Sequence, residues 1–219
     1  DLYLISMKLF KNIKNWLENQ EHLFYLFLFI LIVPNMVLCF TEPLPFMAKV
    51  ANVLLPFGCY YLLMTLSRNC GKMLWILFLF LFFGAFQIVL LYLFGQSIIA
   101  VDMFLNLVTT NSSEALELLD NLTPAIIAVI ILYVPALILG TISIIRKRKL
   151  TVEFIRRERK RAFLVFGISL LSLVGAYVQD SGYELKSDLY PLNVCYNVGL
   201  AFQRTALTQD YRRENGKYM

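Results

Sequence analysis

Residues 22–41 read HLFYLFLFILIVPNMVLCFT, a run of twenty residues without Asp, Glu, Lys or Arg. A helix needs about 20 mainly apolar residues to cross the hydrocarbon core of a bilayer. Four further uncharged windows follow at 50–67, 73–101, 121–145 and 162–179. Because backbone polar groups in lipid must be satisfied within the segment, each window predicts a helix. The sequence therefore predicts an all-α integral membrane protein with five transmembrane helices, the fourth beginning at Thr123-Pro124.

The composition excludes an ordinary soluble enzyme. Hydrophobic residues make up 59% of the 219 residues and charged residues 16%, against roughly 45–50% and about 25% in soluble proteins. A soluble core of this size could not cover so much apolar surface. The net charge of +5 comes from basic residues that lie between the apolar windows. That distribution indicates membrane topology, and we predict no nucleic-acid partner.

The basic residues gather at alternate connections between the windows. Three lysines precede the first window, Arg68 and Lys72 separate the second from the third, and the predicted loop 146–161 contains nine basic residues. The segment 95–120 has four acids and no basic residue. Because positively charged loops stay in the cytoplasm, we predict a cytoplasmic N-terminus and a C-terminus outside.

These boundaries predict three regions: a cytoplasmic N-terminus over 1–21, a transmembrane domain over 22–179 and an external linker over 180–219. Met7 is followed by a lysine-containing stretch, which is typical of the N-terminus of a membrane protein. Translation is therefore predicted to start at Met7, and residues 1–6 are predicted not to belong to the native protein. Apolar residues and tyrosines in the linker predict a helix on the outer membrane surface. The alternative is a partly ordered terminus.

The residue types that commonly carry catalysis or bind metals are scarce. The chain has one histidine, His22, and four cysteines without a C-x-x-C pair. Of the cysteines, only Cys39 and Cys195 are predicted on the same outer side, and the sequence leaves their pairing open. No metal-ligand cluster, nucleotide loop or nucleophile–base–acid set is recognisable. We therefore predict neither a catalytic residue nor a metal site in this chain.

Three polar residues recur every four positions after the third window: Asn106, Thr110 and Glu114. On a continuous helix they fall within roughly 80° of one another, which predicts a polar stripe on a helical excursion at the outer membrane surface. A carboxylate, a hydroxyl and an amide in one line suit a zwitterionic lipid head group. The spacing alone favours another interpretation, in which Asn111 is the N-cap of a helix and Glu114 reaches back to it.

The same segment resembles the membrane domain of the phosphoethanolamine transferases that modify lipid A, the family that includes the mobile colistin-resistance enzymes. The resemblance rests on Asn106, Thr110-Asn111 and Glu114-Ala115, which match the pattern N-x-x-x-T-N-x-x-E-A. The five-span topology and the stretch Leu189-Tyr190-Pro191-Leu192-Asn193 are also similar to the family. With this resemblance, the head-group interpretation of the stripe is favoured over the cap.

The resemblance implies a function and a location. Such enzymes move phosphoethanolamine from phosphatidylethanolamine to lipid A or to the lipopolysaccharide core. They lie in the bacterial inner membrane, and their active face is in the periplasm. For this chain the resemblance implies a periplasmic C-terminus. Their chemistry belongs to a zinc-containing domain outside the membrane, while residues matching Asn106, Thr110 and Glu114 help to bind the donor lipid. This chain stops where that domain would begin, so we expect it to be inactive alone. The competing hypotheses are a structural anchor or assembly partner, and a small transporter.

Overall fold

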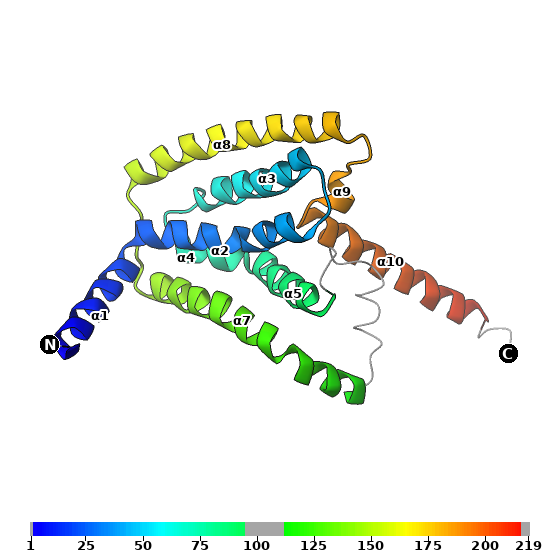
Figure 1. The fold of residues 1–219 in the computed structure, drawn as a ribbon, viewed down its shortest axis with the longest axis horizontal. Coiled ribbons are helices and arrows are strands. Elements are labelled where there is room, and N and C mark those ends of the chain that lie inside the picture. Colours follow the sequence, from blue (N-terminus) through cyan, green and yellow to red (C-terminus); the bar gives the residue numbers. More distant parts are fainter. Residues whose placement is uncertain (1, 95–111, 216–219) are drawn as a thin grey trace.

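The computed structural model describes the backbone of residues 2–94 and 112–215 and the side chains of residues 5–93 and 122–208. The described part of the chain is helical and contains no strand (Figure 1). Its helices are α1 (Leu2–Glu18), α2 (Gln20–Thr41), α3 (Phe46–Met64), α4 (Cys70–Ile76), α5 (Phe78–Phe94), α7 (Ser112–Ile145), α8 (Val152–Gln179), α9 (Leu185–Asp188) and α10 (Leu192–Asn215). The predicted all-α class is confirmed over these residues.

Four of these helices contain a segment long and apolar enough to cross a membrane: α2, α3, residues 122–145 of α7, and α8. The third predicted window is not one straight helix, because α4 and α5 meet at an angle of 63° on either side of Leu77. Counted as one broken span, this pair gives a fifth. Window 73–101 contains no proline, so no residue in it predicts the break.

The basic stretch 146–161 was predicted as a loop, and that prediction is wrong for most of its length. α8 begins at Val152, so only residues 146–151 connect it to α7. Thr151 starts the helix, because its Oγ1 accepts a hydrogen bond from the backbone N–H of Phe154 at 3.2 Å. Glu153 in the first turn adds a favourable charge at the helix N-terminus. The helix therefore starts ten residues before the uncharged window 162–179 and carries five basic residues on its first turns.

Thr123 and Pro124 were predicted as the N-cap and first residue of the fourth helix, and that prediction is wrong, because α7 begins at Ser112 and passes through both residues. The part of α7 that is apolar enough to cross a membrane covers Leu122–Ile145 within the described residues, close to the predicted start of the span. A proline inside a helix removes one backbone hydrogen bond and bends the helix without having to end it. Pro135 lies inside the same helix. The helical excursion predicted before span four is therefore described only over residues 112–121, where it continues into the span.

The bundle has two distinct ends (Figure 1). At the basic end, the C-termini of α3 and α7 meet the N-termini of α2, α4 and α8. At the tail end, the chain leaves α8, forms α9 and continues into α10. A helix in the predicted linker is thus present, and residues 2–18, for which no element was predicted, form α1. The positive-inside prediction places the basic end in the cytoplasm.

The main apolar core lies between α2, α3, α4, α5, α7 and the first turns of α8, and includes Phe24, Leu74, Tyr133 and Phe154. α3 and α8 run side by side along most of their length (Figure 1). The outward faces of α7 and α8 remain apolar and exposed, as at Ile131 and Leu171. Such faces are expected where lipid replaces water as the solvent.

Candidate functional site

The three predicted head-group residues lie largely outside the described structure. Asn106 and Thr110 are outside the described residues, and only the backbone of Glu114 is described. Glu114 is the third residue of α7 and lies in its first turn. A helix beginning at Ser112 agrees with the capping pattern that starts at Asn111. Whether Glu114 shares one face with Asn106 and Thr110 stays a prediction.

The described side chains form a different polar site at the tail end, which we call the amide network: Asn35 of α2, Asn52 of α3 and Tyr183. Asn35 Nδ2 donates to the carbonyls of Asn52 at 3.0 Å and Tyr190 at 2.8 Å. Asn52 Nδ2 donates to the carbonyl of Asp188 at 2.7 Å, and the Tyr183 hydroxyl donates to Asn52 Oδ1. The network ties the segment after α8 to two membrane helices.

Burial explains why these contacts form. Asn35 is 2% exposed, and a buried amide without partners would cost roughly 1–3 kcal/mol. Burial, with a smaller effect of the nearby Asp188 carboxylate, raises the pKa of the Tyr183 hydroxyl. The hydroxyl donates its hydrogen bond to Asn52 Oδ1. The amide network thus fixes the backbone of residues 188–190 against the bundle.

A small cavity adjoins the amide network. Its volume is about 10 Å³, and its lining includes the charged residues Glu42, Lys49 and Asp188. Carboxylates and an ammonium group are the chemistry that a zwitterion would need. A volume of about 10 Å³ holds roughly one water molecule, so the cavity in this conformation is too small for a lipid head group.

Besides the amide network, a further set of buried polar atoms has no hydrogen-bond partner within the described residues. Both amide atoms of Asn193, the Tyr133 hydroxyl and Asn35 Oδ1 belong to it. Gly84 makes room here, because a Cβ atom on it would lie 2.8 Å from the Tyr133 hydroxyl and 3.4 Å from that of Tyr190. Unpartnered buried groups of this kind are the places where bound water or a ligand's polar group is expected.

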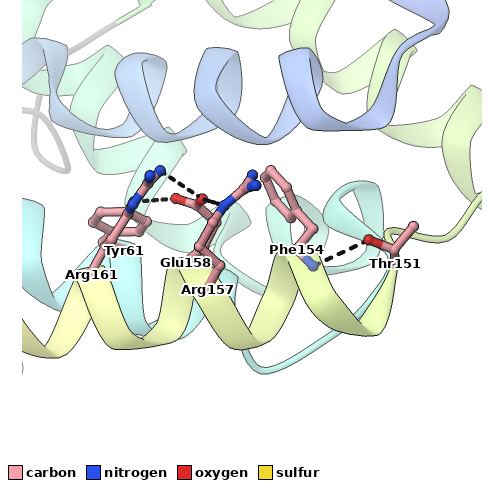
Figure 2. A network of polar contacts seen from close by, with 6 residues as sticks. All are labelled: Tyr61, Thr151, Phe154, Arg157, Glu158 and Arg161. Atoms are coloured by element: carbon pink, nitrogen blue, oxygen red, sulfur yellow. Dashed lines mark hydrogen bonds and ion pairs between the residues drawn. The ribbon is translucent and has the colours of Figure 1, made fainter.

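The basic end contains a third polar arrangement, around Glu158 of α8 (Figure 2). This carboxylate is fully buried and accepts a hydrogen bond from the Tyr61 hydroxyl of α3. Its Oε1 lies 2.9 Å from Arg157 Nε and 3.0 Å from Arg161 Nη1. The Arg157 guanidinium also lies over the Phe154 ring, 5.2 Å from its centroid. A carboxylate with three partners is satisfied, so we assign it to joining α3 and α8 and not to chemistry.

Sequence reasoning did not predict the amide network or the Glu158 contacts. Two signals were present: Asn35 follows Pro34 inside a window that is otherwise nearly free of polar groups, and Glu158 stands among five basic residues. The partners could not be read from the sequence, because they lie up to 155 residues apart. Cys39 and Cys195 are both free thiols in the structure.

The described residues contain no group of three or more His, Cys, Asp or Glu side chains that could hold a metal ion. Comparison with protein-family models, with curated proteins and with solved structures finds no match for this chain. The resemblance to the phosphoethanolamine transferases therefore rests on the short pattern from Asn106 to Ala115 and on the stretch Leu189–Asn193.

Proposed function

We propose that this chain is the membrane module of a phosphoethanolamine transferase, which takes phosphoethanolamine from phosphatidylethanolamine and passes it to lipid A or the lipopolysaccharide core. The chain anchors the enzyme in the bacterial inner membrane and helps to bind the donor lipid at the periplasmic face. The observation that carries the proposal is the pattern of Asn106, Thr110-Asn111 and Glu114-Ala115 between the third span and the fourth.

The position of Glu114 supports this role. It lies in the first turn of α7, eight residues before Leu122, where the described apolar segment begins, a place suited to a head group at the membrane surface. The unpaired backbone N–H groups of a helix N-terminus attract phosphate. The Glu114 carboxylate would pair with the ammonium group of the ethanolamine.

The amide network supports the anchoring part of the proposal. Asn35 and Asn52 hold the carbonyls of Tyr190 and Asp188, so the chain leaves the bundle for α10 from a fixed position. In the proposed enzyme, zinc belongs to a further domain outside the membrane and supplies the phosphoryl-transfer chemistry there. The part of this chain is to bind and orient the donor lipid.

The test is Glu114→Gln in the complete enzyme, with lipid A modification measured by mass spectrometry. Losing one charge-assisted contact of roughly 1.5–3 kcal/mol should lower transfer about 10- to 100-fold. The matched control is Asp120→Asn, which removes a carboxylate from the same helix about 120° away from Glu114. Unchanged transfer by Glu114→Gln, or an equal loss in both variants, would refute the head-group role.

A small transporter is the second candidate, favoured by the break between α4 and α5. Broken spans and buried polar groups are typical of transporter binding sites, and Asn193 and Tyr133 supply such groups. Substrate flux through proteoliposomes that contain only this chain would support transport. Absence of flux together with retention of phosphatidylethanolamine would favour the transferase module.

A further inference from the structure

A second pocket lies at the basic end, against the first turns of α8. It is an open pocket of about 490 Å³, which we call the arginine pocket. Its cationic lining consists of Arg68, Arg156, Arg159 and Lys160. Its apolar lining consists of Val152, Ile155 and Phe163. Among the described residues, no acidic side chain lines it.

Helix geometry and two hydrogen bonds bring the cations together. Residues 152, 156, 159 and 163 recur every three or four positions, so they share one face of α8. Arg159 Nη2 donates to the carbonyl of Thr65 at 2.7 Å. Arg68, from the connection between α3 and α4, donates through Nε to the carbonyl of Leu150 at 2.8 Å. Both guanidinium groups are thus held in place by backbone, with further N–H groups left to bind a ligand.

The pocket lacks the counter-charges that the other arginines of this end possess. Arg157 and Arg161 contact Glu158, and Arg146 and Arg148 contact Glu18. None of the four pocket cations forms an ion pair with a described carboxylate. Four like charges around one pocket repel each other, and an anion between them would relieve that repulsion.

The apolar lining identifies the class of anion. Phe163 is 61% exposed and Leu164 is 67% exposed, and the apolar part of α8 continues from them. A free phosphate ion would make no favourable contact with this apolar surface, whereas an acyl chain would pack along it. We infer that the arginine pocket binds the phosphate of an acidic glycerophospholipid in the leaflet at the basic end. Its acyl chains then pack on Phe163 and the following turns of α8.

The experiment measures binding of short-chain phosphatidylglycerol to the purified, delipidated chain by native mass spectrometry. The test variant is Arg156→Gln with Lys160→Gln, because neither side chain forms a hydrogen bond or ion pair among the described contacts and the fold should persist. The control is Lys147→Gln with Lys149→Gln, which removes the same charge from exposed residues of the same end. Short-chain phosphatidylcholine and inorganic phosphate serve as the other probes.

The expected result is a loss of phosphatidylglycerol affinity of about tenfold or more in the pocket variant, and of less than about twofold in the control. Phosphatidylcholine should bind at least about tenfold more weakly than phosphatidylglycerol to the unmodified chain, and inorganic phosphate should not displace the lipid. Equal losses of affinity in both variants would show that the lipid responds only to the overall surface charge of this end, and would overturn the inference. Displacement by inorganic phosphate at equal concentration would overturn the lipid assignment, because it would show a site for a free anion.

Discussion

At the scale of single residues, Glu158 is the only charged side chain that is fully buried among those described. Its position is set by α3 on one side, through Tyr61, and by two arginines of its own helix. Those arginines are more than half exposed. If the carboxylate were lost, water could therefore replace its hydrogen bonds to their guanidinium groups. The cost of losing Glu158 is therefore expected to arise mainly from the unpaired Tyr61 hydroxyl and from the contact between α3 and α8.

Glu158→Gln should destabilise the protein by about 1–3 kcal/mol, because the amide replaces charge-assisted contacts with weaker ones. For a chain of this size, each kcal/mol lowers the thermal midpoint by about 2–4 °C. The measurement is thermal unfolding in detergent, with Glu153→Gln as the control, since Glu153 is exposed on the first turn of the same helix. Equal midpoints for the two variants would contradict the role assigned to Glu158.

At the scale of elements, charge-free windows located the spans but not the ends of the helices. α8 starts ten residues before its window because Thr151 caps it in the basic stretch. α7 starts at Ser112 because neither Pro124 nor Pro135 ends it. An uncharged window predicts which residues lie in the lipid. The first residue of a helix is set by the residue that caps its backbone, which can lie outside that window. Both differences follow from this distinction.

α4 and α7 pack through two glycines, and this contact gives the element-scale prediction. A Cβ atom on Gly71 would clash with the backbone carbonyl of Gly140, so Gly71→Ala must push α4 away from α7. A loss of about 1–3 kcal/mol is expected from such overpacking. Gly167→Ala is the control, because a Cβ atom there has no neighbour within 4 Å. A thermal midpoint lowered equally by both changes would show that the close packing of α4 on α7 is wrong.

At the scale of the whole molecule, the class and approximate number of spans were predictable from the sequence, but the polar sites were not. Hydrophobicity is a local property of the sequence, so residues 22–41 predict a membrane helix without reference to the rest of the chain. The partners of Asn35 and Glu158 come from distant parts of the chain, and only the packed bundle brings them together. The stripe of Asn106, Thr110 and Glu114 stays a prediction, since those side chains lie outside the described structure.

The orientation of the molecule can be tested with its own cysteine. Cys195 is exposed at the tail end, which is predicted to face outward. In a Cys39→Ser background, which removes the other cysteine predicted on the outer side, a membrane-impermeant maleimide should therefore label intact spheroplasts at Cys195. The labelling should disappear when Cys195→Ser is added. Lys149→Cys in that background, at the basic end, should react only after the membrane is permeabilised. The reverse pattern would invert the predicted topology.

The central claim is that the tail end of this bundle binds the head group of phosphatidylethanolamine. Native mass spectrometry of the purified chain, offered equal amounts of phosphatidylethanolamine and phosphatidylcholine, tests it without the rest of an enzyme. We predict retained phosphatidylethanolamine, because a primary ammonium can donate hydrogen bonds to Glu114 and a quaternary one cannot. We also predict loss of that preference in Glu114→Gln and its survival in Asp120→Asn. Equal retention of the two lipids by the unmodified chain would contradict the claim.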